Sequence, residues 1–147
     1  MSGCLLGISR REKKRAGMEL MDSADVTLAG GIADDFRGTP GLRQVTVMSR
    51  EAWQKVCADA GCELPWQTRR ANLLVEGLEL CGTTDRVISI GDVRLLITGE
   101  TDPCQRMEEA YAGLSQAMAT EWRGGVCCRV VVPGRISVGD KVELNNG

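Results

Sequence analysis

The sequence predicts a mainly β protein, a barrel-like or folded sheet with two or three short helices. Roughly seven or eight short segments carry branched apolar residues or alternate apolar with polar residues, as strands do. Only the segments after Ser49 and after Pro103 repeat apolar residues at helical spacing. Most strand signals follow one another without a helix between them, which disfavours alternating βαβ units. The 147 residues suit one domain with its own core, so we assign residues 1–147 to a single domain.

The first half of the chain predicts strands at 4–9, 24–28 and 43–48. A long glycine-containing loop, 30–42, separates the last two, and it lacks the lysine and glycine spacing of a phosphate-binding loop. A helix follows, capped at its start by Ser49 and stopped by Gly61. Its apolar face consists of Trp53, Val56, Cys57 and Ala60.

The second half predicts a buried strand at 73–75 and another at 126–132, which places Cys127 and Cys128 on opposite faces. Two similar stretches, around Gly91-Asp92 and Gly139-Asp140, each predict a hairpin turn between paired strands. After a strand at 92–98, one helical face is predicted from apolar residues at steps of four, three and four, namely Met107, Tyr111, Leu114 and Met118.

Cys104 lies where this strand joins this helix and is the first candidate for chemistry. Asp102 is a suitable N-cap, and Pro103 suits the first helical position. Cys104 would then be the second helical residue, where the helix dipole favours the thiolate, the reactive and metal-binding form of cysteine. The negative charge of Asp102 opposes this effect and Arg106 offsets it, so the balance stays open. The alternative is a small apolar side chain at a buried corner.

Two arginine-containing segments are candidates for binding an anion. The run 10–15 holds five basic residues and one acidic residue, which suits a solvated loop or a flap over an anionic ligand. Arg69, Arg70 and Asn72 precede the buried strand at 73–75. They suit bidentate binding of a carboxylate or phosphate, or an exposed turn with a surface ion pair.

Composition excludes several classes of function. The net charge of −2 and the few aromatic residues argue against a nucleic-acid partner. Histidine is absent, which removes histidine general bases and histidine metal ligands. The seven cysteines form no C-x-x-C pair, and the N-terminal apolar run is too short for a signal peptide or a membrane span. We therefore expect a cytoplasmic protein with reduced thiols and no membrane partner.

Assembled in order, the motifs resemble a small stand-alone MOSC domain, the molybdenum cofactor sulfurase C-terminal type. The resemblance covers nearly the whole chain, and its order of Arg-x-Asn-Leu, Pro-Cys, Arg-Gly-Gly-Val and Val-Gly-Asp is its most specific feature. The segments that carry it are Gly31–Gly38, Arg43–Val47, Arg69–Leu78, Ile90–Asp92, Glu100–Cys104, Arg123–Val126 and Gly134–Asp140.

The resemblance implies a barrel similar to that of pyruvate kinase, with Cys104 in the place of the family cysteine. That residue is proposed to carry sulfur as a persulfide or to bind molybdenum of a pterin cofactor. The family's Arg-x-Asn segment, which lines the cofactor pocket, corresponds to Arg70 and Asn72. Further pocket positions correspond to Arg43, Thr101 and Asp102. The chain departs from the family by lacking the N-terminal companion domain of larger relatives and by having Asp34-Asp35 where many have Gly-Asp.

Three functions follow as expectations. The first is a sulfur carrier that takes sulfur from a pyridoxal-phosphate cysteine desulfurase, or another donor, and passes it to a metal–sulfur or molybdenum-cofactor acceptor. The second is a molybdenum-cofactor (molybdopterin) reductase of N-hydroxylated substrates, since thiolate suits molybdenum. The third is a binding module without chemistry. The enzyme class, sulfurtransferase-like or oxidoreductase, stays open, and we also consider a protein purified with no cofactor bound.

Overall fold

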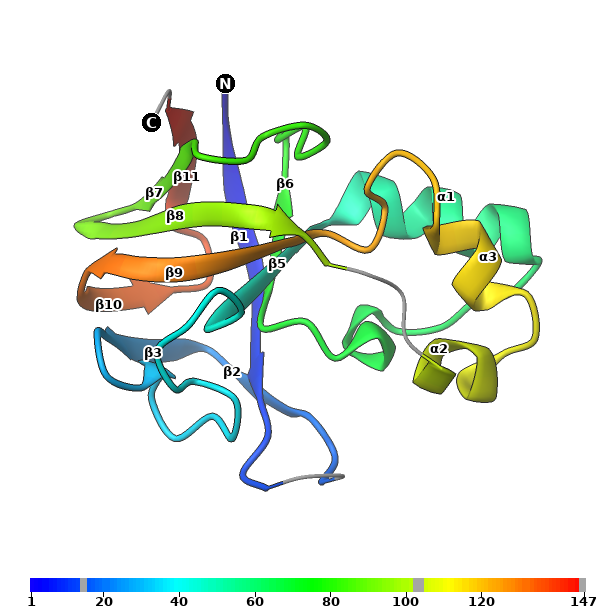
Figure 1. The fold of residues 1–147 in the computed structure, drawn as a ribbon, viewed down its shortest axis with the longest axis horizontal. Helices are drawn as coiled ribbons and strands as arrows, with labels where there is room; N and C mark the ends of the chain where they lie inside the picture. Colours follow the sequence, from blue (N-terminus) through cyan, green and yellow to red (C-terminus); the bar gives the residue numbers. More distant parts are fainter. Residues whose placement is uncertain (14–15, 102–104, 146–147) are drawn as a thin grey trace.

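The protein is a closed seven-stranded barrel with its helices gathered beyond one side of it (Figure 1). The computed structural model describes residues 1–13, 16–101 and 105–145. The ring runs β11-β7-β8-β9-β5-β6-β1 and closes through the pairing of β11 with β1. Its strands are β1 (Ser2–Arg10), β5 (Val45–Ser49), β6 (Leu73–Glu76), β7 (Val87–Ile90), β8 (Val93–Glu100), β9 (Val126–Val132) and β11 (Lys141–Asn145). The predicted mainly β, barrel-like fold is thus confirmed.

Strand β1 closes the barrel because it is long enough to pair with three partners in turn. Its start pairs with β11, its middle with β6, and its end with β2 (Glu19–Met21). A bulge between Leu5 and Gly7 bends it between partners. The first and last strands of the chain therefore lie side by side (Figure 1). A small second sheet of β3 (Ser23–Thr27), β4 (Gly31–Ile32) and β10 (Gly134–Ser137) lies against the barrel.

The barrel interior is filled by branched aliphatic side chains from alternate strand positions. In β11, for example, Val142 and Leu144 are buried and their neighbours are exposed. Cys128 lies inside this core and is fully buried, and that burial raises the pKa of its thiol. Cys127 is outside the barrel core, with its sulfur 3.4 Å from the Thr101 hydroxyl. The prediction that the two cysteines occupy opposite faces is confirmed.

The first helix forms as its sequence predicts. α1 (Arg50–Ala60) begins where the Ser49 hydroxyl accepts a hydrogen bond from the Ala52 amide at 3.1 Å. It ends at Gly61, which adopts the left-handed conformation with φ 73°. Its apolar face packs with the short 3₁₀ helix η1 (Trp66–Arg69) and the later helices around a second apolar core. The buried members of that core are Met48, Trp53, Val56, Ala71, Leu74, Met107, Leu114 and Met118.

The prediction of a single helix after Pro103 is wrong in one respect, because the structure has two shorter helices there. α2 (Gln105–Ala110) and α3 (Leu114–Met118) are separated by a turn in which Gly113 has φ 88°. The Glu108 carboxylate accepts hydrogen bonds from the amides of Gly113 and Ser115, at 2.9 and 3.3 Å. These bonds satisfy amide groups at the start of α3 and stabilise the break.

Of the two predicted hairpins, the one at Gly91-Asp92 is confirmed by the pairing of β7 with β8. The prediction of a hairpin at Gly139-Asp140 is wrong. The turn at Gly139 forms, and the Asp140 carboxylate accepts from the Ser137 amide at 2.8 Å. The flanking strands, however, belong to different sheets: β10 pairs with β3, and β11 pairs with β7 and β1. The turn therefore carries the chain from one sheet to the other.

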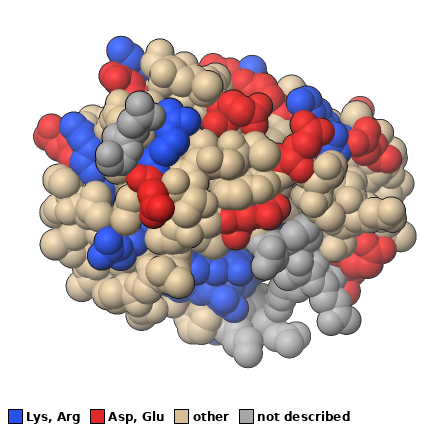
Figure 2. All heavy atoms as spheres, turned by 45° about the horizontal axis from the view of Figure 1, so that its top comes forward, with Lys and Arg blue, Asp and Glu red and all other residues tan. Residues whose placement is uncertain are grey.

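The surface carries both signs of charge close together. Figure 2 shows lysine and arginine interspersed with aspartate and glutamate on the face drawn, in keeping with the net charge of −2. Within the described part of the chain, no helix is long and apolar enough to cross a membrane.

Candidate functional site

Three segments that are far apart in sequence meet where β8 ends. The Arg69 guanidinium donates from Nε to the Gly124 carbonyl oxygen at 3.2 Å. The Thr101 amide donates to the Gly125 carbonyl oxygen at 2.9 Å. A β-carbon built on Gly124 would lie 2.8 Å from the Thr101 carbonyl oxygen, so only glycine fits this approach. The η1 turn, the end of β8 and the loop before β9 are thereby fixed to one another.

The predicted residues Asp102 and Cys104 follow directly after Thr101 and lie outside the described residues. Thr101 itself is buried, with its hydroxyl against the Cys127 sulfur. The chain thus leaves the barrel toward residues 102–104 from a fixed position beside a buried arginine, Arg69, which is only 3 % exposed.

Arg69 and Arg70 are neighbours in sequence, but their side chains reach different loops. Arg70 has φ 65°, a left-handed conformation that turns the chain sharply after η1. Its Nη2 atom donates to the Ala16 carbonyl oxygen at 2.6 Å, whereas Arg69 reaches Gly124. The buried Arg69 does not belong to an exposed turn, and binding of a carboxylate or phosphate by this segment stays a prediction. In the structure each of the two arginines contacts a different loop.

Asn72 lies at the centre of a buried hydrogen-bond network. Its amide oxygen accepts from the amide and the hydroxyl of Thr46, at 3.0 and 3.3 Å. Its amide nitrogen donates to the Ser9 carbonyl oxygen at 3.1 Å and to the Asp35 carboxylate at 3.3 Å. These four contacts use the full hydrogen-bonding capacity of a side-chain amide. Any influence of Asn72 on a bound group therefore acts through the segments it joins.

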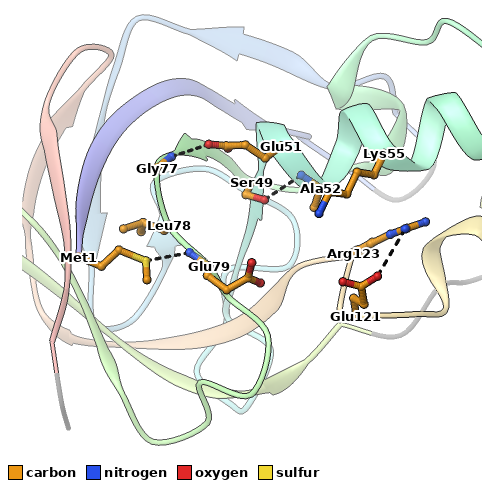
Figure 3. Close-up of a pocket in the computed structure, with 10 residues that line it drawn as sticks. All are labelled: Met1, Ser49, Glu51, Ala52, Lys55, Gly77, Leu78, Glu79, Glu121 and Arg123. Atoms are coloured by element: carbon orange, nitrogen blue, oxygen red, sulfur yellow. Dashed lines mark hydrogen bonds and ion pairs between the residues drawn. The ribbon is translucent and has the colours of Figure 1, made fainter.

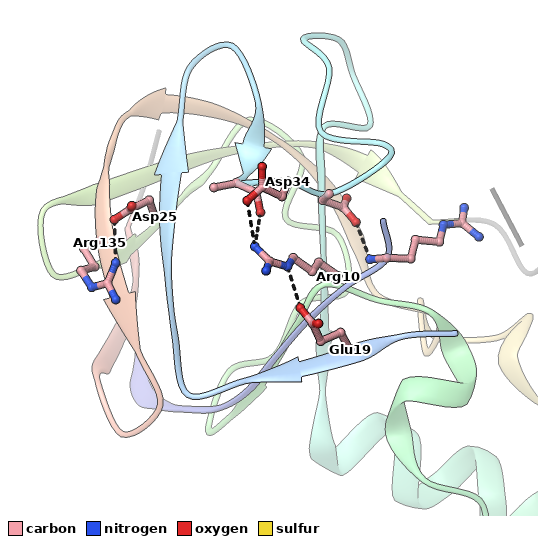
Figure 4. Close-up of polar contacts among 8 residues, drawn as sticks. Arg10, Glu19, Asp25, Asp34 and Arg135 are labelled. Carbon is pink, nitrogen blue, oxygen red and sulfur yellow. Dashed lines mark hydrogen bonds and ion pairs between the residues drawn. The ribbon is translucent and has the colours of Figure 1, made fainter. Parts of the chain in front are cut away.

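Arg10 joins the basic segment to the acidic loop that follows β4. It contacts Glu19 at 3.0 Å and Asp34 at 3.4 Å, and it donates to the Ala33 carbonyl oxygen at 2.7 Å (Figure 4). The next residue, Arg11, donates its backbone amide to Asp35 at 3.0 Å. The start of the segment 10–15 is therefore held against the loop. Figure 4 also shows the separate ion pair of Arg135 with Asp25, at 2.8 Å.

Arg43 is exposed, in contrast to Thr101 and Asn72. It lines an open hollow of about 370 Å³ together with Phe36, Arg37 and Pro40. The two arginines make this hollow cationic, which suits an anionic group. Arg43 reaches it from the chain just before β5.

A further hollow of about 340 Å³ lies over the start of α1 (Figure 3). Charged groups of both signs line it, including Glu51, Lys55, Glu79 and Arg123. The Glu51 carboxylate accepts from the Gly77 amide at 2.8 Å, and Arg123 contacts Glu121 at 3.6 Å (Figure 3). Because both signs of charge line it, the hollow offers no single-sign surface to a ligand.

Asp35 and Gly124 had no site role in the sequence-based prediction, and Arg69 was named there only as one of two arginines that suit an anion. Each lies beside a predicted residue in a motif, but sequence does not show which of two adjacent charged side chains turns inward. The Arg-Gly-Gly motif was the available signal for Gly124, because adjacent glycines indicate a close backbone approach.

The described residues contain no group of three or more His, Cys, Asp or Glu side chains that could hold a metal ion. Cys104, the predicted molybdenum ligand, lies outside the described residues. Among the predicted cofactor-binding residues that the structure describes, Arg70 and Arg43 carry cationic groups that fit a phosphate. Thr101 and Asn72 are committed to contacts inside the protein.

A protein-family model, the MOSC domain, matches residues 33–143. No curated protein matches the sequence. Among solved structures, the YuaD protein from Bacillus subtilis is similar, with a TM-score of 0.84, 22% identity, and coverage of 100% of this chain and 97% of that one.

Two further solved structures, both of YiiM proteins, share the fold. YiiM from Escherichia coli has a TM-score of 0.76 at 16% identity, covering 100% of this chain and 71% of that one. YiiM from Geobacillus stearothermophilus has a TM-score of 0.70 at 14% identity, covering 97% and 72%.

Proposed function

Because the chain belongs to the MOSC domain family, we propose that it is a sulfur carrier in which Cys104 holds the transferred sulfur as a persulfide. One observation supports this choice above the others: Arg69, Thr101 and Gly124 are fixed to one another where β8 ends. The chain needs such a rigid exit from the barrel if a thiol three residues beyond Thr101 is to meet a partner's sulfur in a reproducible position.

The proposed step is a thiol exchange. The Cys104 thiolate attacks the terminal sulfur of a donor persulfide, R–S–SH. The bond between the two donor sulfurs breaks, Cys104 becomes Cys–S–SH, and the donor leaves as R–S⁻. The Cys104 sulfur is oxidised to the persulfide level and the donor sulfur is reduced to a thiolate by the same two electrons, so no external oxidant is needed. The proton stays with the transferred sulfur. The step needs no histidine, which the sequence lacks.

The donor that fits this step is a cysteine desulfurase, which holds its own pyridoxal phosphate and presents a persulfide. The acceptor is a metal–sulfur centre or a molybdenum cofactor on another protein. Arg70 and Arg43 are the cationic groups that would attract an anionic acceptor to the site. Asn72 acts as a positioning residue, because it joins the strand β1, the strand β5 and the Asp35 loop.

Sulfur loading tests the proposal directly. We expect the wild-type protein, incubated with a cysteine desulfurase and cysteine, to gain the mass of one sulfur atom, and Cys104→Ser to lose this gain completely. The matched control is Cys81→Ser, which removes an exposed thiol and should load like the wild type. An equal gain in Cys104→Ser would disprove the assignment of the carrier residue.

Metal analysis separates the carrier from a molybdenum-cofactor reductase. If Cys104 binds molybdenum, protein purified from a host that makes the cofactor will contain molybdenum, and Cys104→Ser will contain much less. If the protein is a sulfur carrier, we expect the wild type to release sulfide on reduction with dithiothreitol. We also expect the wild type to contain no more molybdenum than Cys104→Ser. Molybdenum near one atom per chain in the wild type alone would instead support the reductase.

A further inference from the structure

Two cysteines other than Cys104 lie close together at the C-terminal end of α1. Cys57 is in the last turn of α1, and Cys62 follows its terminal Gly61. We propose that Cys57 and Cys62 form a reversible disulfide and make this helix end a redox-active dithiol site. The proposal uses neither Cys104 nor the sulfur-carrier function.

The backbone places the two cysteines opposite each other. The Cys62 amide donates to the Cys57 carbonyl oxygen at 3.0 Å, and the Gly61 amide donates to the Ala58 carbonyl oxygen at 3.3 Å. With Gly61 left-handed, these two bonds define a Schellman motif, in which the side chains of the first and last residues contact each other. Their hydrogen bond keeps the two α-carbons within the roughly 4.4–6.8 Å that disulfides bridge.

Their side chains are close enough to interact and are also reachable. The Cys57 side chain lies close enough to Cys62 to contribute to the raised pKa of the Cys62 thiol. Both residues are partly exposed and line a hollow of about 550 Å³, together with Trp53, Ala58 and Leu64. A small disulfide or peroxide can therefore reach either sulfur. The adjacent pair Cys127 and Cys128, by contrast, is buried and faces opposite ways.

The two thiols are bridged in two exchange steps. Partial burial, followed by the interaction with Cys57, raises the pKa of the Cys62 thiol. The Cys57 thiolate attacks a small-molecule disulfide RSSR, which gives Cys57–S–S–R and one RS⁻. Cys62, as a thiolate, then attacks the Cys57 sulfur and releases the second RS⁻. The two protein thiols lose two electrons and two protons, and RSSR becomes two RSH.

One peptide reports the outcome, because trypsin cleavage after Lys55 and Arg69 leaves both cysteines in the peptide 56–69. The full chain is treated with oxidised glutathione, alkylated with iodoacetamide, digested without reduction and weighed. We expect this peptide to be two hydrogens lighter, unalkylated and free of glutathione, and to recover both alkylation sites after dithiothreitol. The rate of bridging should rise with pH, because the thiolate is the attacking form.

Single variants test whether the second thiol completes the bridge. We expect Cys62→Ser to retain one glutathione on Cys57, since the resolving thiol is missing, and Cys81→Ser to bridge like the wild type. The proposal is overturned if the wild-type peptide keeps both alkylation sites, retains glutathione, or is bridged to a different peptide. The wild-type measurement decides the question even if a variant folds poorly.

Discussion

Replacing Gly125 with alanine is expected to destabilise the barrel by about 4 kcal/mol or more, enough to leave much of the protein unfolded. Gly125 has φ 95°, a conformation that residues with a side chain rarely adopt. A β-carbon there would lie 2.2 Å from the Val47 carbonyl oxygen of β5, which is rigid backbone. Relief of this clash requires β9 to move away from β5, and their pairing is part of the closed ring.

Gly139→Ala is the matched control for this substitution. Gly139 has nearly the same backbone angle, φ 99°, but a β-carbon there meets no atom within 4 Å. Its cost is the backbone strain alone, about 1–2 kcal/mol. Urea denaturation followed by circular dichroism measures both variants. Equal losses of stability in the two variants would show that the clash with Val47 contributes nothing. The second glycine of the Arg-Gly-Gly motif would then be needed only for its backbone conformation.

The sequence was a good guide to which segments are strands, because they are rich in branched apolar residues and because some of them, such as β8 and β11, alternate buried with less buried positions. It was a poor guide to which strands pair. Gly91-Asp92 and Gly139-Asp140 look alike, yet only the first turn joins paired strands. The second separates β10 from β11 because each has a better partner elsewhere: Ile136 lies opposite Ala24, and Val142 opposite Ile90. Such partners are distant in sequence and leave no local signal.

The helix after Pro103 shows a similar limit. Its apolar residues follow helical spacing, and Met107, Leu114 and Met118 are buried as that spacing predicts. Tyr111 is instead 39% exposed and donates its hydroxyl to the Gly61 carbonyl oxygen at 3.1 Å. Two short helices on either side of a left-handed Gly113 can bury the same set of residues as one longer helix, so periodicity alone does not distinguish them.

For the candidate site, the motifs marked segments that the structure brings together, but they did not show what each side chain contacts. The Arg-x-Asn motif predicted a ligand-binding role for Asn72, and the structure places its amide in internal hydrogen bonds. Arg69, outside that motif, is the arginine that fixes the exit of β8 to the Gly124 loop. Inward and outward orientations of adjacent polar residues depend on the turn at Arg70, whose positive φ the sequence did not indicate.

The network around Asn72 leads to the second large effect. Asn72→Ala is expected to destabilise the protein by about 3–5 kcal/mol, because it leaves the Thr46 amide and the Ser9 carbonyl oxygen buried without their partner. The substitution also removes one of two hydrogen bonds to the Asp35 carboxylate, and leaves the one donated by the Arg11 amide. Thermal and urea denaturation of the protein without any added ligand measures the loss.

Asn145→Ala provides the comparison, because Asn145 is exposed and donates one hydrogen bond, at 2.7 Å to the Ser89 hydroxyl. Water replaces that bond, so we expect a loss below about 1 kcal/mol. If Asn72→Ala is as stable as Asn145→Ala, the network does not hold the fold, and Asn72 is free to contact a ligand directly. If Asn72→Ala is much less stable, we then compare its sulfur loading with its folded fraction. Loading that falls only in proportion to the folded fraction shows that Asn72 acts by holding β1, β5 and the Asp35 loop together.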